Sequence, residues 1–432
     1  MKHQKALFCV LLALSIHAID ASRILGIFPY NGKSHFRMFD VLCKELAKRG
    51  HQVDVISHFP LKTPLANYTD IVDLNGTLKT VVNGLTTDYG KHIQQSIAYF
   101  VATTFGNDLC DLMKLEKMQK FIKNPPNDPP YDLIIVEVNI FKLKRFGQLL
   151  KAPVAIAMSS MQMSFIDDIM GNPTSYAFLS GFYNDNAVVD TFFDRLELEK
   201  TVSLAIVNSH YSYYGIRPVT PAVIEVGGLH VEADKSKLSP VMILLNNSLK
   251  SSLISFPSIS FATLLSSIKS DQIKGLSDVS LTEHPNTRVF VTHGGLMGTQ
   301  EATYYGVPMI GIPVFGDQIK NVNILVEKNV AVLMDIDDIT EHSMDVAKQS
   351  LSDIVHYCFR ESAKTMSKMF RDRPMTAIDT AVYWIEYVLR NGPDSLRSAA
   401  VKLPWWKLHL LDVFVFLFAC FTFVVRKVPF VL

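Results

Sequence analysis

The chain has 432 residues, which corresponds to about three average domains and excludes a peptide or one small module. Its 42 basic and 41 acidic residues nearly cancel, and a net charge of +1 argues against broad electrostatic binding to nucleic acid. Hydrophobic residues make up 48% and charged residues 19% of the chain, so we expect large buried cores and little disorder.

Residues 1–21 are predicted to be a secretory signal peptide. Basic residues precede an apolar run over residues 6–14, and small residues up to Ala21 offer a cleavage site. Beyond this peptide and the C-terminal apolar segment, the cysteines are odd in number and widely spaced, which excludes a disulfide framework and a zinc site: Cys43, Cys110 and Cys358. We therefore expect no metal.

Residues 22–217 are predicted to form a first α/β domain. A short apolar strand pattern starts at Arg23, residues 36–49 have helical spacing, and a second strand pattern starts at Val53. This order of strand, helix and strand is typical of a βαβ unit in a parallel sheet. Further strands of the buried type are predicted at residues 132–137, 154–157 and 204–208.

A second α/β domain is predicted over residues 218–375, entered through a linker that is rich in proline and glycine. It repeats the order of strand, turn, helix and strand, with the helix at residues 297–305. Open parallel sheets bind ligands at the carboxyl ends of their strands, so we expect the chemistry between the two domains. Residues 376–404 are predicted to hold an amphipathic helix and a linker.

The apolar segment over residues 405–425 is predicted to be a transmembrane helix. Its length is close to the roughly 20 residues that span a bilayer, with tryptophans at one end and basic residues at the other. The protein would then be single-pass, with a lumenal bulk and cytoplasmic residues 426–432. His409 and Asp412 shorten the apolar run, and a buried amphipathic helix is the alternative. Glycosylation sequons compatible with a lumenal bulk start at Asn67, Asn75 and Asn246.

Residues 290–318 carry the most chemical information. His293 ends a strand, and the glycines after it allow backbone amides at a helix N-terminus to approach an anion such as a diphosphate. Glu301, further into the helix, is predicted to accept hydrogen bonds from a ribose diol. Asp317 and Gln318 offer an acceptor and an amide for sugar hydroxyls. The alternative for the glycines is that they serve only tight turns.

This segment resembles the signature of the UDP-glycosyltransferase family, of the membrane-bound UDP-glucuronosyltransferase type. Its Thr-Gln-Glu-Ala sequence at residues 299–302 is similar to that of insect members. The motifs at residues 32–36, 226–230 and 379–388 also fit the family pattern. The resemblance implies a GT-B-like pair of Rossmann-type α/β domains plus a C-terminal transmembrane helix, with the acceptor in the first domain and the nucleotide sugar in the second. It implies donor contacts from His293, Gly294, Gly295, Gly298, Thr299, Glu301, Asp317 and Gln318.

The resemblance also assigns His35 as the general base. A neutral imidazole would remove the acceptor's hydroxyl proton as the oxygen attacks the anomeric carbon, and an ordinary pKa near 6.5 suits that role. Glu137 matches the family's acidic partner of this histidine, with Asp132 as the second choice. Glu137 has the alternative of being an ordinary acid at a strand end, and other histidines compete with His35 for the role of base: His51, His58, His284 and His293.

The implied function is transfer of a hexose, with inversion, from UDP-glucose or UDP-glucuronate to hydroxyl groups of small lipophilic acceptors. The resemblance implies no cofactor or metal, a detoxifying enzyme in the endoplasmic reticulum membrane, and no nucleic-acid partner, and it leaves room for a homo-oligomer. The chain departs from the family pattern around residues 232–283, where the segment is abridged and lacks the tryptophan that stacks on uracil. A non-catalytic relative that acts as a binding or partner subunit is therefore the second hypothesis.

Overall fold

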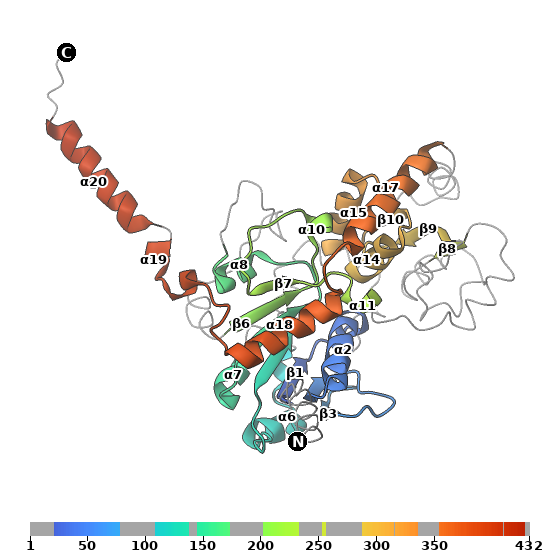
Figure 1. The fold of residues 1–432 in the computed structure, drawn as a ribbon, viewed down its shortest axis with the longest axis horizontal. Helices are drawn as coiled ribbons and strands as arrows, with labels where there is room; N and C mark the ends of the chain where they lie inside the picture. Colours follow the sequence, from blue (N-terminus) through green and yellow to red (C-terminus); the bar gives the residue numbers. More distant parts are fainter. Residues whose placement is uncertain are drawn as a thin grey trace, which may run out of the picture.

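The computed structural model describes residues 21–77, 109–137, 145–172, 202–232, 253–255, 287–314, 316–335, 354–408 and 410–427. Two β-sheets in this part of the chain carry helices on their faces and form two lobes (Figure 1). The α/β class and the two-lobe organisation predicted from the sequence are therefore present. Several predicted features lie wholly or largely outside the described residues: the signal peptide, Asn246, the abridged segment, His284 and the tail after residue 427.

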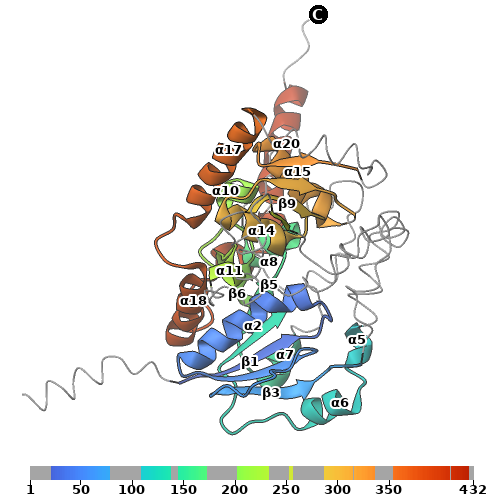
Figure 2. The same ribbon diagram turned by 90° about the vertical axis from the view of Figure 1, so that its right-hand side faces the viewer.

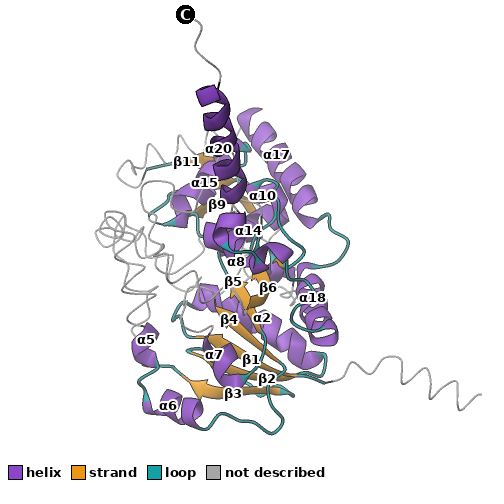
Figure 3. Cartoon of the chain, turned by 90° about the vertical axis from the view of Figure 1, so that its left-hand side faces the viewer, coloured by secondary structure: helices purple, strands orange, loops and turns teal. Residues whose placement is uncertain are grey.

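The described part of the first lobe is built on a parallel sheet of seven strands in the order β3-β2-β1-β4-β5-β6-β7. The strands are β1 (Arg23–Phe28), β2 (Gln52–Ser57), β3 (Tyr68–Asp73), β4 (Leu133–Glu137), β5 (Val154–Met158), β6 (Val202–Val207) and β7 (Val223–Glu225). The helices of this lobe are α2 (Lys33–Lys48), α5 (Leu109–Leu112), α6 (Glu116–Lys123), α7 (Arg145–Leu150), α8 (Ser164–Met170), α10 (Tyr211–Tyr214) and α11 (Leu229–Glu232). Figure 3 shows helices on both faces of this sheet.

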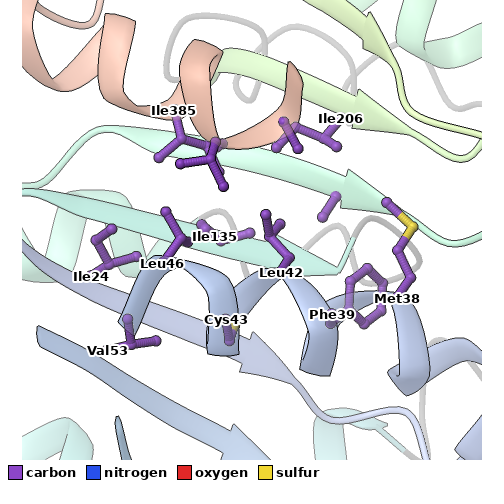
Figure 4. Packing of buried hydrophobic residues seen from close by; sticks show 14 of the residues in the cluster. Ile24, Met38, Phe39, Leu42, Cys43, Leu46, Val53, Ile135, Ile206 and Ile385 are labelled. Carbon is purple, nitrogen blue, oxygen red and sulfur yellow. The ribbon is translucent and has the colours of Figure 1, made fainter. Parts of the chain in front are cut away.

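Alternate residues of each strand pack on opposite faces of the first sheet. Ile24 packs under α2, whereas its neighbour Leu25 packs on the opposite face with α6. The same alternation places Ile135 on the α2 face, where Leu42 and Ile385 complete the cluster (Figure 4). Full burial of such a side chain stabilises the fold by about 1.5–3 kcal/mol, so this two-sided core fixes the strand register.

The second lobe contains a smaller parallel sheet with the order β11-β10-β9-β8 among the described residues. Its strands are β8 (Leu253–Ser255), β9 (Thr287–Thr292), β10 (Met309–Gly311) and β11 (Ala331–Leu333). Its helices are α14 (Leu296–Tyr305), α15 (Asp317–Glu327) and α17 (Ile354–Arg371). Figure 2 shows α11 of the first lobe between α2 and α14, and α11 contacts both helices.

The boundary between the lobes differs from the expected one at residue 217. The segment predicted as a linker supplies β7, which pairs with β6 and completes the first sheet. Val223 and Ile224 are buried there, and the flanking prolines and glycines end this short strand without preventing it. The first lobe therefore extends through β7 and α11, up to Glu232.

The helix predicted ahead of the C-terminal apolar segment is α18 (Ala377–Asn391), and it returns to the first lobe (Figure 1). It packs on α2, β6 and β7. Its Asp379 pairs with Arg49 at the end of α2, and its buried Glu386 lies 3.5 Å from the ring of His51. Helix α18 thus packs on the first lobe, on the side of α2, although it follows the second lobe in the chain.

The C-terminal apolar segment forms two helices instead of the single span expected over residues 405–425. These are α19 (Trp405–Leu408) and α20 (Leu411–Lys427), preceded by the 3-10 helix η5 (Ala399–Lys402). Leu410 has a left-handed φ of 55° and ends the continuity between α19 and α20. Helix α20 extends away from both lobes (Figure 1), and the described side chains of residues 411–421 are exposed. Among the described helices, none combines the length and the apolar character needed to cross a membrane.

Candidate active site

His35 lies in the first turn of α2, directly after the loop that follows β1. The loop is short, so α2 begins at Lys33, before the predicted residues 36–49, and it includes His35. Its ring packs edge-on against Tyr30 at 4.9 Å, and its Nδ1 is 3.4 Å from the hydroxyl oxygen of Ser34. The side chain is half-buried, and removal from water lowers the pKa of His35 to about 4. At neutral pH the ring is therefore uncharged and able to accept a proton.

Glu137 ends β4, the strand next to β1, at the same carboxyl edge of the sheet. The alternation along β4 places its side chain on the α2 face, as for Ile135. Burial raises the pKa of Glu137 to about 8, opposed by a hydrogen bond from the backbone of Tyr30. No hydrogen bond or ion pair joins Glu137 to His35 within the described residues. The predicted acidic partner is thus close to the base in the fold and is held as a neutral acid.

The other candidates for the acid and base lie elsewhere in the first lobe. Asp132 directly precedes β4 and accepts a hydrogen bond from the backbone of Arg23, so it lies about 16 Å from Glu137 at the opposite edge of the sheet. His51 lies at that opposite edge and accepts a hydrogen bond from the backbone of Ser22. His58 is at the carboxyl edge but is 2% exposed, with Nε2 at 2.9 Å from the carbonyl oxygen of Pro29. His35 is the half-exposed histidine of the described first lobe at this edge.

The predicted diphosphate loop connects β9 to α14 in the second lobe. Gly294 has a left-handed φ of 84°, and an added Cβ would lie 2.7 Å from the carbonyl oxygen of Gln318. Gly295 is the N-cap of α14, and a Cβ there would collide with Nε2 of His293. Both glycines are therefore needed for close approach, one to the backbone of α15 and the other to the imidazole ring.

The N-terminus of α14 remains accessible between the lobes. Residues 295, 297 and 298 and the ring of His293 are half-buried, and no side chain caps the first turn. The first backbone amides of a helix have no partner within it, so this turn offers donors and a positive dipole end to an anion. Burial lowers the pKa of His293 to about 4, so the ring acts as a neutral hydrogen-bonding group. Gly298, in the same turn, allows a ligand to approach the backbone closely.

Asp317 and Gln318 begin α15, after the loop that follows β10. Burial raises the pKa of Asp317, and a hydrogen bond from Asn321 at 3.0 Å opposes this shift. Gln318 is 5% exposed, and its Oε1 accepts a hydrogen bond from the backbone of Val314 at 2.9 Å. In this conformation Gln318 holds the β10–α15 loop in place, and its predicted contact with the sugar stays a prediction.

Glu301 and Thr299 differ in what they can offer a ligand. The carboxylate of Glu301 is 15% exposed and lies 3.5 Å from Nε2 of His230 in the first lobe. Thr299 is fully buried, and its hydroxyl donates to the carbonyl oxygens of Gly295 and Leu296. The hydroxyl of Thr299 is thus used inside α14, whereas Glu301 remains open to solvent on one side.

Asn321 is a supporting residue that the sequence analysis does not identify. Its fully buried amide donates to the carbonyl oxygen of Gly294 and to the carboxylate of Asp317, both at 3.0 Å. Its Oδ1 accepts a hydrogen bond from the hydroxyl of Tyr214, in the first lobe, at 2.9 Å. The spacing from Asp317, four residues along one helix, is the sequence signal that could have indicated this contact.

Gln300 is a second supporting residue, and it joins the lobes next to the predicted diphosphate loop, which is called the donor loop below. Its amide nitrogen donates to the carbonyl oxygen of Asn208 at 3.2 Å, and its amide oxygen accepts from the backbone of Gly228 at 3.1 Å. Asn208 follows β6 at the carboxyl edge of the first sheet, and its amide also contacts the sulfur of Met297 at 3.5 Å. This contact brings the carboxyl edge that carries His35 against the start of α14. The described residues contain no group of three or more His, Cys, Asp or Glu side chains arranged to hold a metal.

Comparisons with known proteins agree with this geometry. A family profile described as UDP-glucoronosyl and UDP-glucosyl transferase matches residues 272–429. UDP-glucosyltransferase 2 of Dactylopius coccus is 29% identical over 98% of this chain and 95% of its own length. UDP-glucuronosyltransferase 2B13 of Oryctolagus cuniculus is 32% identical over 52% of this chain and 48% of its own length. The alignment with the Dactylopius protein runs over 505 positions, so that relative holds residues without a counterpart in this chain of 432.

Solved structures of glycosyltransferases share the fold. A UDP-glucosyltransferase from Polygonum tinctorium, capable of glucosylating indoxyl, aligns with a TM-score of 0.56 over 85% of this chain and 98% of its own, at 14% identity. Phytolacca americana UGT2, complexed with UDP-2fluoro-glucose and pterostilbene, aligns with a TM-score of 0.52 over 86% of this chain and 100% of its own, at 14% identity. These likenesses establish the two-lobe GT-B fold.

Fold, donor loop and family matches lead to one assignment. Together these matches support a member of the UDP-glycosyltransferase family, a glycosyltransferase that transfers glucose or glucuronic acid from a UDP-sugar.

Proposed function

We propose that this chain transfers a hexose with inversion to hydroxyl groups of small lipophilic compounds, with His35 as the general base. The observation that carries the proposal is the position of the two lobes. The carboxyl edge of the first sheet contacts the start of α14 through Asn208, and His35 lies at that edge, after β1. Three strand steps separate β1 from β6, which is about 14 Å along the carboxyl edge of the sheet.

The proposed reaction is a single displacement. The acceptor oxygen bonds to the anomeric carbon, the bond from that carbon to UDP breaks, and the acceptor proton passes to His35. In this proposal Nδ1–H of His35 donates to the hydroxyl oxygen of Ser34, and Nε2 is the nitrogen that accepts the proton. UDP leaves as an anion that the amides of α14 and the ring of His293 stabilise, as expected for preorganised donors.

Glu137 has a limited part in this mechanism. A carboxyl with a pKa of about 8 is mostly protonated at neutral pH, and a neutral acid stabilises an imidazolium less than a carboxylate does. The proposal therefore assigns proton removal to His35 and gives Glu137 a hydrogen-bonding role near Tyr30. With a protonated Glu137 and a neutral His35, the acceptor hydroxyl would meet an uncharged base.

The acceptor class and the membrane location are part of the proposal. Among the solved structures with this fold, one enzyme is capable of glucosylating indoxyl and another is complexed with pterostilbene, and these two compounds motivate the proposed acceptor class. The exposed apolar residues of α20 would anchor the protein, with Trp406 at the lumenal interface. Asn67 and Asn75 are exposed, as glycosylation in the lumen of the endoplasmic reticulum requires.

Titration of UDP and product analysis test the proposal together. The full chain in detergent should bind UDP, and it should convert a panel of phenols with UDP-glucose or UDP-glucuronate to β-glycosides. His35→Gln should reduce turnover by about a hundredfold or more while UDP affinity stays unchanged. His58→Gln is the matched control at the same sheet edge, because its amide still reaches the carbonyl of Pro29. No UDP binding at millimolar concentration, or full turnover by His35→Gln, would refute the proposal.

The membrane anchor is tested separately. A chain that ends after Leu403 lacks α19 and α20 and should leave the membrane fraction on alkaline extraction, while its UDP affinity matches that of the full chain. Persistent membrane association of the shortened chain would contradict an anchor in α20.

A further inference from the structure

The flank of α14 rests on the first lobe, and this contact reaches a predicted substrate-binding residue. Gln300 bridges the loops that follow β6 and β7, and it is fully buried. One residue further along α14, Glu301 also faces the first lobe, where His230 of α11 lies next to its carboxylate. The helix that carries the diphosphate loop is therefore positioned from outside its own lobe.

His230 makes its contacts through one ring nitrogen. Nε2 lies 3.2 Å from the carbonyl oxygen of Met297 and 3.5 Å from Oε1 of Glu301, and both are acceptors. Nε2 must therefore carry the proton that it shares between them. The ring is 1% exposed, so packing holds it in this orientation. A carboxylate has about four acceptor positions, and the contact with His230 takes one of them.

We propose that His230 is a positioning residue for the donor site, which orients the Glu301 carboxylate for the two hydroxyl groups of the donor ribose. The inference rests on the proposed function, because it takes the nucleotide to lie along the start of α14. A side chain that is oriented before the ligand arrives loses less freedom on binding, so its hydrogen bonds contribute more to affinity. The first lobe would thereby set the strength of nucleotide recognition in the second.

Comparison of UDP with 2′,3′-dideoxy-UDP isolates this contact. The two nucleotides share the uracil and the diphosphate and differ only in the hydroxyls that Glu301 would bind. Calorimetry on the full chain should give UDP an advantage of about tenfold or more, as expected for hydrogen bonds to a charged group. His230→Asn should reduce that advantage by about fivefold, because its amide falls short of Glu301, with dideoxy-UDP affinity nearly unchanged.

Matched variants separate positioning from general damage. His230→Gln places an amide donor where Nε2 was and should keep most of the advantage of UDP. His210→Ala removes another buried histidine of the same lobe, which bonds to Ser212, and should leave the ratio of the two affinities unchanged. In a Glu301→Ala background, His230→Asn should have no further effect on the ratio.

Each outcome decides the matter. Equal ratios for the wild type and His230→Asn, or equal losses of both nucleotides, would overturn the role of His230 while leaving the proposed function intact. A wild type that binds neither nucleotide would overturn the proposed function and this inference with it. Circular dichroism shows whether each variant folds. If His230→Asn does not fold, His230→Gln is compared with Glu301→Ala, and only Glu301→Ala should lose the preference for UDP over dideoxy-UDP.

Discussion

Two adjacent glycines in the donor loop should respond to alanine in different ways. Gly294 has a φ of 84°, and an added Cβ would lie 2.7 Å from the carbonyl oxygen of Gln318. A left-handed backbone costs a non-glycine residue about 1–2 kcal/mol, and overpacking costs about 1–3 kcal/mol. Gly294→Ala should therefore lower the free energy of unfolding by about 2–4 kcal/mol.

Gly295→Ala should spare stability and reduce nucleotide binding. Gly295 has φ −61° and ψ 133°, which alanine adopts freely, and its Cβ would meet the flexible ring of His293. Loss of glycine at an N-cap costs less than about 1 kcal/mol. Rotation of the His293 ring out of the loop removes a ligand contact, so UDP affinity should fall about tenfold, which is 1.4 kcal/mol.

Urea unfolding followed by circular dichroism measures the first effect, and calorimetric titration with UDP measures the second. Gly306→Ala is the control for backbone conformation, because Gly306 also has a left-handed backbone, with φ 70° and ψ 37°. A Cβ added at Gly306 would have its nearest neighbouring atom 3.4 Å away, so this variant adds no severe clash. Gly294→Ala should destabilise more than this control. If the two cost the same, or if Gly295→Ala loses stability and keeps UDP affinity, the reasoning about the donor loop is wrong.

Four further predictions concern protons and packing. Glu137→Gln should stabilise the protein more at pH 8 than at pH 5, as measured by urea unfolding. Burial raises the pKa of Glu137 from 4.5 to about 8, so between these pH values the folded state holds a proton that the unfolded chain releases. The stability of the wild type therefore falls as pH rises through this range, and the variant lacks this loss. Because burial lowers the pKa of His35 to about 4, kcat/KM should stay level from pH 7 to about 5, and a fall centred near 6.5 would contradict this. Ile385→Ala should cost about 2–4 kcal/mol in the same unfolding assay, since the side chain is fully buried between α18 and the first sheet. Tyr214→Phe should cost about 1 kcal/mol in UDP affinity by calorimetry, since it removes the hydrogen bond to Asn321, and unchanged affinity would separate that bond from donor binding.

The elements predicted from the sequence are those whose local pattern also describes their surroundings. The strands that begin at Arg23 and at residues 52–53 and the helix between them form as expected, because apolar spacing and burial agree. The sequence does not predict β7, because its three residues are too few for a strand pattern and lie among residues typical of loops. Its pairing with β6 comes from the sheet, which no local window contains.

The candidate site divides along the same line. The motif places His293, Gly295 and Gly298 at the start of α14, where they are half-buried, because a strand, turn and helix bring them there locally. The protonation state of Glu137 follows from its burial in a sheet of seven strands. The four apolar residues before it in the sequence indicate a buried strand but do not give the pKa of its carboxyl. Asn321 and His230 were not assigned, since their partners come from distant segments.

These distant partners show why the motif on α14 is only part of the donor site. The backbone of Gly294 is held by Asn321, which in turn accepts a hydrogen bond from Tyr214 of the first lobe. Gln300 adds two buried hydrogen bonds to that lobe, and each such bond contributes about 0.5–1.5 kcal/mol. Contacts from both lobes therefore support the loop and the helix that follows it. The proposed donor site and the proposed placement of His35 opposite the donor then depend on the same interface, so a change that separates the lobes should weaken UDP affinity and turnover at once.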